Sequence, residues 1–138
     1  TLGTLFDQLQ LPCQNPRLRA HTVLAGGPVN PERGFILHND GRTWDSSLHL
    51  SSGYTISTSR DILKALAAGE GPDQFLVLLG YSGWSAGQLE DELADNAWLN
   101  APLSEQIVFK MPLTERWQAA AKQLGVDLSL ISGQSGHA

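Results

Sequence analysis

The sequence is poor in cysteine, in basic side chains and in long apolar runs. Cys13 is the only cysteine, so no intrachain disulfide can form, which favours a reducing compartment. No apolar run approaches the roughly 20 residues that a transmembrane helix needs, and no charged-then-apolar leader opens the chain. We therefore expect a cytoplasmic protein that does not enter a membrane.

The shortage of positive charge bears on the kind of partner. Nine Lys and Arg residues stand against fourteen Asp and Glu, which gives a net charge of −5. Sequence-independent DNA binding depends on cations that neutralise phosphates. Only Arg17 and Arg19 lie close together in the sequence, and a DNA-binding face would have to gather Arg33 and Arg42 beside them. The charge balance argues against direct nucleic-acid binding.

What the chain does contain is typical of one soluble domain over residues 1–138, with 41% hydrophobic residues. Residues 74–100 contain its most apolar run, its densest glycine cluster and its strongest helix start. The apolar run of residues 75–79 predicts a strand covered on both faces. A glycine-rich elbow follows, and Ser85 with Gln88 has the capping-box spacing of a helix start near Ala86.

The first half of the chain predicts both helices and strands. Residues 1–10 have apolar side chains at helical spacing, with Thr4 as the expected cap, but no earlier segment to cover that apolar face. Residues 21–25 and 33–38 read as strands joined by glycine and proline turns, as a hairpin or as two sheet edges. Residues 54–56 predict a short strand, and residues 58–69 a helix that Thr58 begins and Gly69 ends.

Two more elements are expected near the end of the chain. Residues 107–109, with Ile, Val and Phe in a row, predict a strand after Pro102. A last helix is expected from Leu113 to Gly125, and one more apolar cluster follows in residues 127–138.

The elbow resembles two known catalytic or binding turns only in part. A nucleophile elbow built on Ser82 needs a small residue two places later, and Trp84 stands there. The glycines Gly80, Gly83 and Gly87 match neither the dinucleotide fingerprint nor the P-loop, and acidic residues follow them closely. We favour the interpretation of this elbow as a structural turn. As a binding site, it would fit a neutral ligand or a peptide carbonyl better than a phosphate.

Histidines and tryptophans leave further alternatives open. His38 with Asp40, or His49 with Asp45, could supply metal ligands, but no histidine pair or cysteine cluster has metal-binding spacing, so we expect no metal. His38, at the end of a strand, fits a hydrogen-bonded edge residue better. Three tryptophans, at positions 44, 84 and 98, could line a pocket or belong to the core.

Arg33 is the basic residue of most interest, because it stands where a glycine-rich loop meets a strand. It could pair with an acidic residue inside the protein, which we favour, or it could recognise a carboxylate from outside.

Several runs together resemble one family. They are GGPV with ERGFILH, YTISTSRDIL, GEGP, LGYSGWSAGQLEDELADNAWL and the closing GHA. In this order, over nearly the whole chain, they are similar to the bacterial AlgH/YqgE family. The resemblance implies an α+β fold, with a bifurcated mixed β-sheet folded into a pseudo-barrel and helices packed outside.

The resemblance also implies a function that is poorly characterised. The AlgH name attaches the family to regulation of alginate biosynthesis as a transcriptional regulator, and the family brings no established catalytic residue and no cofactor. Family members usually carry further strands before the helix that here begins at Thr1. We expect that the lack of these strands exposes a sheet edge and favours self-association.

The leading hypothesis is a non-enzymatic binding or regulatory domain that acts indirectly, through an unknown protein or small-molecule partner. Its candidate groove joins the turn of residues 26–33 to the elbow of residues 80–88. The candidate binding residues are Gly26, Gly27, Arg33, His38, Ser82, Gly83, Trp84 and Gln88. The alternative is a hydrolase-like enzyme that uses Ser82 or His38 at the elbow, which requires a histidine within hydrogen-bond reach of Ser82.

Overall fold

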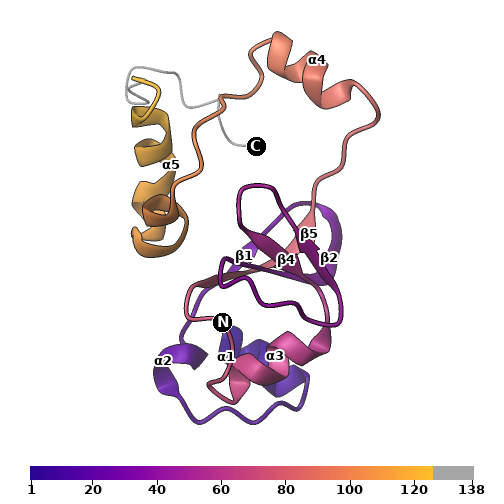
Figure 1. Cartoon of the computed structure of the whole chain (residues 1–138), viewed down its shortest axis with the longest axis vertical. Helices are drawn as coiled ribbons and strands as arrows, with labels where there is room; N and C mark the ends of the chain where they lie inside the picture. Colours follow the sequence, from indigo (N-terminus) through magenta and orange to yellow (C-terminus); the bar gives the residue numbers. More distant parts are fainter. Residues whose placement is uncertain (126–138) are drawn as a thin grey trace. The chain divides into compact units, whose positions relative to one another are not determined.

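The structure is a computed structural model that describes residues 1–125 (Figure 1). By its internal contacts the chain divides into two units, Thr1–Ser82 and Gly83–Ala138, and each is described by itself. His137 and the apolar cluster expected in residues 127–138 lie outside the described residues. None of the helices in residues 1–125 combines the length and the apolar character that crossing a bilayer demands.

The first unit is built on a mixed five-stranded sheet. Its strands are β1 (Val23–Ala25), β2 (Val29–His38), β3 (Ser47–His49), β4 (Thr55–Ser57) and β5 (Phe75–Tyr81). Their order is β1-β5-β2-β4-β3, and only the β1–β5 pair is parallel. The α+β class is thus confirmed. The sheet is open, with β1 and β3 at its edges, and closure into a pseudo-barrel stays a prediction.

The expected hairpin of β1 and β2 is wrong, because β5 lies between them and pairs with both. The long apolar run of β5 explains this outcome, since a central strand gains cover and hydrogen bonds from two neighbours. The alternative prediction, that both strands lie at sheet edges, is right only for β1. The strand expected at residues 54–56 is confirmed as β4, and β3 occupies a segment whose sequence was ambiguous.

Three helices of this unit, α1 (Leu2–Gln8), α2 (Pro16–Arg19) and α3 (Arg60–Ala67), lie on one side of the sheet (Figure 1). Leu2 and Phe6 of α1 are fully buried, in one core with Ile62 of α3 and Val77 of β5. The apolar face of α1 is therefore covered, contrary to the expectation that it has no partner. A helix can bury its apolar stripe against later strands as well as earlier ones.

The helix ends differ in detail from the sequence expectations. Thr1, and not Thr4, caps α1, because its hydroxyl accepts from the Thr4 backbone N–H at 3.3 Å. Ser59, and not Thr58, precedes α3, and its side chain bonds Asp61 and no backbone N–H of the helix. The stop after α3 is confirmed, since Gly69 has a φ of 78° that favours glycine.

The second face of the sheet is apolar throughout. Strand partners share a face, so the register places seven residues there: Leu24, Phe35, Leu37, Leu48, Ile56, Leu76 and Leu78. None of them is fully buried, and Leu48 is 61% exposed. The expectation that β5 is covered on both faces holds fully for one face only: Phe75 and Val77 are buried, whereas Leu76 and Leu78 on the other face are half-buried.

In the described part of the second unit, three helices follow one another: α4 (Gln88–Ala94), the π-helix η1 (Gln106–Lys110) and α5 (Leu113–Lys122). The strand expected at residues 107–109 is wrong. Ser104 begins a helical turn there, with its hydroxyl accepting from the Ile107 N–H, and Arg116 of α5 donates to the Val108 and Met111 carbonyls. These side chains satisfy backbone groups that a strand would pair with a neighbour.

The last helix is confirmed, and Gly125 follows it with a φ of 73°. Helix α4 begins at Gln88, later than expected, because Gly87 has a left-handed conformation with a φ of 81°. Only one half of the capping box forms. The Gln88 side-chain oxygen accepts from the Ser85 N–H at 2.9 Å. The Ser85 hydroxyl donates to the same oxygen, so it does not accept from the helix backbone as the complete box requires.

Candidate functional site

Two of the predicted segments meet inside the first unit at three glycines, Gly26, Gly27 and Gly80, here called the glycine crossing. The Gly26 N–H donates to the Leu79 carbonyl at 2.7 Å. A Cβ on Gly27 would lie 2.3 Å from the Tyr81 carbonyl carbon and 2.6 Å from the Ser82 nitrogen. The turn of residues 26–33 and the start of the elbow are therefore neighbours, with backbone packed directly on backbone.

Beside this crossing, an exposed cation lies on an aromatic platform that consists of Phe35 and Tyr81. The Arg33 guanidinium carbon is 5.5 Å from the centre of the Phe35 ring. Phe35 and Tyr81 meet edge to face at 5.9 Å, and the Asn30 amide lies 3.5 Å from the Tyr81 hydroxyl. Residues 29–34 bulge out of the β2–β5 pairing, and Asn30 has a φ of 44°. The bulge lifts this loop away from the ladder.

Among residues 1–125, Arg33 does not form the internal ion pair that the sequence favoured. Its side chain is exposed, and within residues 1–125 the ion pairs of the structure involve other cations. Stacking on Phe35 orients the guanidinium while its N–H donors stay open to water. This arrangement can bind a carboxylate.

His38 lies elsewhere, at the opposite end of β2. His38 lies five positions after Arg33 along the strand, or about 17 Å away at the usual rise. The side chain is fully buried: Nδ1 lies 3.0 Å from Asp40 Oδ1 and Nε2 lies 3.0 Å from the Ser57 hydroxyl. The Ser57 hydroxyl continues to Ser47 at 2.8 Å. His38 is hydrogen-bonded, as expected, but the expectation of an edge residue is wrong, because β2 pairs with a strand on each side.

The hydrogen-bonded network Asp40–His38–Ser57 has the order of a catalytic triad. The burial of Ser57, however, does not suit catalysis. Ser57 has no exposed surface, so its hydroxyl cannot meet a substrate without a rearrangement of the sheet. The network instead provides hydrogen-bond partners for polar groups inside the protein. With Nδ1–H donating to Asp40 and the Ser57 hydroxyl donating to Nε2, every member has a partner.

Asp40 also holds Arg42. Burial alone would raise the pKa of Asp40, but hydrogen bonds from the Arg42 side chain and backbone N–H, together with the charge of Arg42, hold it below its usual range. The Arg42 Nε lies 2.7 Å from the carboxylate, and its guanidinium covers the Trp44 ring at 5.0 Å. Trp44 packs against the core of the first unit, whereas Trp84 and Trp98 belong to the second unit.

The remaining candidate residues fall on either side of the unit boundary. Ser82 ends the first unit with an exposed side chain, and Gly83, Trp84 and Gln88 belong to the second. The structure thus brings Gly26 and Gly27 together with Ser82, and Arg33 close to Tyr81, but it places His38 apart. The groove as a whole stays a prediction.

The histidine partner required for catalysis by Ser82 is not found among the described residues. The imidazoles of His21, His38 and His49 bond to other groups: the Thr22 carbonyl, the Asp40–Ser57 pair, and the hydroxyls of Thr43 and Thr55. Residues 1–125 likewise contain no group of three or more His, Cys, Asp or Glu side chains arranged to hold a metal ion.

Sequence reasoning missed one cluster in the second unit. Trp84 and Trp98 meet edge to face at 5.9 Å, and the Trp98 indole N–H donates to Glu92 at 3.3 Å. The sequence indicates the two tryptophans together as possible pocket residues, but it does not identify Glu92 as their partner. Trp98 lies six residues after Glu92, and helix α4 ends between them, so the chain can turn back and bring the indole to the carboxylate. This spacing could have indicated the contact.

Comparisons with known proteins identify the chain's relatives. The AlgH-like family profile matches residues 1–129. A UPF0301 protein of Xanthomonas campestris is 52% identical over 138 residues, which are 100% of this chain and 73% of that protein. A UPF0301 protein of Alcanivorax borkumensis is 50% identical over 137 residues, 99% of this chain and 73% of that protein.

A solved structure agrees with the fold. The solution structure of the AlgH protein from Pseudomonas aeruginosa superposes with a TM-score of 0.75 at 48% identity, and covers 99% of this chain and 72% of that one. The resemblance inferred from the sequence runs is confirmed by all three comparisons. The chain belongs to the AlgH-like family.

Proposed function

We propose that this chain is a cytoplasmic binding domain that recognises a carboxylate group of a protein or small ligand through Arg33. The observation that carries the proposal is the exposed Arg33 guanidinium, stacked on Phe35 and without an ion pair in residues 1–125. A guanidinium offers two parallel N–H donors to a carboxylate, and a stacked one loses little rotamer freedom on binding.

The surroundings of Arg33 support recognition of a specific shape. The glycine crossing fixes the backbone beneath it, and the Tyr81 hydroxyl beside Asn30 offers a second polar contact. The single cysteine supports placing this binding in the cytoplasm. Any regulatory role in alginate biosynthesis, which the family resemblance implies, would then be exerted indirectly, through the bound partner.

Direct DNA binding is disfavoured because two of the arginines that a DNA-binding face would have to gather, Arg19 and Arg42, already form ion pairs. Arg19 forms a two-pronged pair with Asp7, at 3.1 and 2.7 Å, and Arg42 pairs with Asp40. Both cations are therefore already neutralised by carboxylates within the fold. Together with the net charge of −5, this leaves little free positive charge for a phosphate backbone.

A ligand screen with matched variants tests the proposal. Thermal shift and NMR would follow a panel of carboxylates, nucleotides and metabolites on the wild type, on Arg33→Ala and on Arg17→Ala, which removes an exposed arginine from another element. Loss of a charge-assisted hydrogen-bond pair is expected to weaken a carboxylate hit by about tenfold or more in Arg33→Ala alone. Hits that bind equally to all three proteins, or steeply salt-dependent binding of DNA, would refute the proposal.

A further inference from the structure

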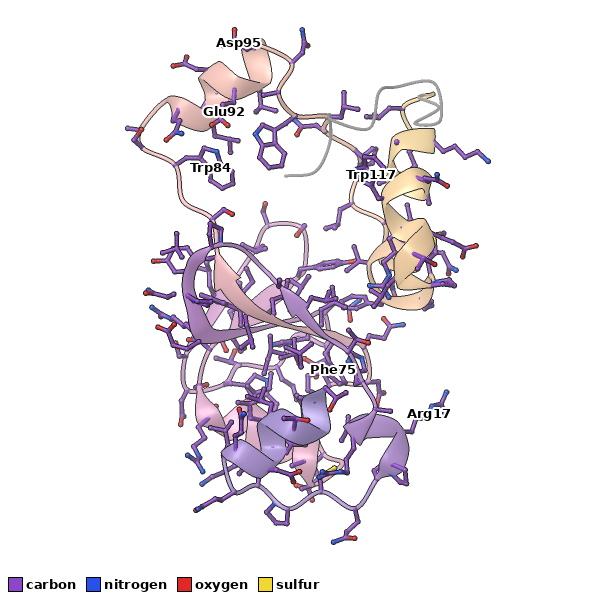
Figure 2. The ribbon with its side chains drawn as sticks, turned by 180° about the vertical axis from the view of Figure 1, so that it is seen from behind. Arg17, Phe75, Trp84, Glu92, Asp95 and Trp117 are labelled. Atoms are coloured by element: carbon purple, nitrogen blue, oxygen red, sulfur yellow. The ribbon has the colours of Figure 1, made fainter. Side chains whose placement is uncertain are left out.

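The second unit contains an aromatic and acidic cluster that the carboxylate site does not involve. Trp84 precedes α4 and Trp98 follows it, and their rings meet at 5.9 Å with an angle of 70° between the planes. Trp84 is 38% exposed, so the pair is accessible to solvent at this residue. In Figure 2, Trp84 and Glu92 lie on the same side of α4, whereas Asp95 lies on the other.

Glu92 is the polar member of this cluster, and only one of its oxygens has a partner. Oε1 accepts from the Trp98 indole N–H at 3.3 Å. Oε2 is buried and makes no hydrogen bond with any of the described residues. A buried carboxylate oxygen without a donor is costly, so a ligand that displaces the side chains covering it and donates an N–H to it would be stabilised.

The local charge decides which ligand fits. Residues 83–104 contain four acidic residues, Glu90, Asp91, Glu92 and Asp95, and no lysine or arginine. Anions are therefore repelled. A cation is attracted by the carboxylates and also by the electron-rich faces of the indole rings. The group must also carry an N–H, because the free acceptor is Glu92 Oε2.

From these contacts we infer that Trp84, Trp98 and Glu92 form a binding site for an organic cation with N–H donors, a protonated amine or a guanidinium. The cation lies against the indole faces and donates to Glu92 Oε2, while the Trp98 N–H holds Oε1 in place. The source of the cation is a free amine or a lysine or arginine side chain of another protein. The site uses residues of the second unit only, so it is independent of Arg33.

The test is an NMR titration of the 138-residue protein, labelled with nitrogen-15, with butylammonium chloride at constant ionic strength. The indole N–H signals of Trp84 and Trp98 are the reporters. We expect a saturable shift of the Trp98 signal, since its N–H is bonded to the carboxylate that binds the cation. Tetramethylammonium, which has no N–H, is expected to bind at least severalfold more weakly.

Two variants separate this site from general attraction to an acidic helix. Glu92→Gln keeps the side-chain shape and is expected to weaken butylammonium binding by about tenfold, since a charge-assisted hydrogen bond is lost. Glu90→Gln removes the same charge from an exposed position of α4 and is expected to weaken it by less than about twofold. Equal losses in both variants would overturn the inference, as would the absence of a saturable shift.

A third variant and a second probe complete the design. Trp98→Phe keeps an aromatic ring but removes the donor to Glu92, and binding followed at the Trp84 signal should weaken. Should Glu92→Gln fail to fold, this variant still tests the site.

A blocked tripeptide with a central lysine distinguishes the two sources of the cation. If it binds more tightly than butylammonium, the cation belongs to a protein partner, and if it binds more weakly, a free amine is the ligand. Equal binding of tetramethylammonium and butylammonium would refute the role of Glu92.

Discussion

The glycine crossing makes a sharp stability prediction for Gly27→Ala. The new Cβ would lie 2.3 and 2.4 Å from the Tyr81 carbonyl carbon and oxygen, and 2.6 Å from the Ser82 nitrogen. Carbon atoms at rest stand about 3.5–4.0 Å apart, so the two backbones must separate by roughly 1 Å. All three obstructing atoms belong to the main chain, and no side-chain rotation can relieve the overlap.

The cost of this separation follows from two contributions. Forcing a methyl group into a packed site costs about 1–3 kcal/mol. The same movement stretches the neighbouring hydrogen bond from the Gly26 N–H to the Leu79 carbonyl, now 2.7 Å, and its loss costs about 1 kcal/mol. We expect Gly27→Ala to lower the free energy of unfolding by about 2–4 kcal/mol, and the melting temperature of a unit of this size by roughly 10–20 °C.

Gly34→Ala is the matched control, because it adds the same methyl group beside the same strand, β5, without a clash. Its Cβ would meet only Leu79 Cδ2, at 3.8 Å, which is an ordinary contact. Alanine is favoured over glycine within a strand by about 0.5–1 kcal/mol, so this variant should be as stable as the wild type or slightly more so.

The assay for both variants is native-state amide hydrogen exchange at the residues of β5, which reports on the first unit alone. Urea unfolding followed by circular dichroism gives a second measure of the same free energy. A Gly27→Ala protein within 0.5 kcal/mol of the wild type, or a Gly34→Ala protein that loses as much, would refute the close backbone approach.

Three further predictions concern the sheet. Ser57→Ala leaves buried His38 Nε2 without its partner and should cost about 1–3 kcal/mol in urea unfolding; no loss would contradict the buried network. The lowered pKa of Asp40 means that its stabilisation is complete above the unfolded pKa of about 3.9 and is lost as the pH falls through the lower folded value. Asp40→Asn, which no longer attracts Arg42, should therefore reduce stability at pH 7 and flatten the acid side of the stability–pH curve; an unchanged curve would count against the pairing. Self-association through the edge strand β3 should diminish in Leu48→Lys, measured by light scattering, and a wild type that is monomeric at all concentrations would exclude it.

Local sequence signals were sufficient for most elements of the first unit. The unbroken apolar run of residues 75–79 indicated the central strand, and the glycine after α3 marked the end of that helix. Pairing was harder to predict. Nothing in the turn of residues 26–28 shows that β5 inserts between β1 and β2, because this depends on a contact between segments some 50 residues apart in the chain. Such contacts leave no periodic trace in either segment.

The error at residues 107–109 has a different cause. Ile, Val and Phe favour strands by propensity, but a strand also needs a partner for its backbone groups. In the described part of the second unit those groups are satisfied by Ser104 and by Arg116, which lies further along the chain. Tertiary contacts thus overrode propensity. The same limit hid the candidate sites: Arg33 was identified by its place in a loop, while its stacking on Phe35 could not be foreseen.

The two proposed sites have opposite charge and lie in different units, so their tests separate cleanly. Arg33→Ala should weaken binding of a carboxylate and leave the butylammonium titration unchanged, because no residue of the Trp84–Trp98 cluster belongs to the first unit. Glu92→Gln should do the reverse. If a single variant weakened both ligands, the change would have to act through the folding of the whole chain, and neither local contact could be credited. Two independent losses would establish a binding domain that presents a cationic and an anionic site to its partners.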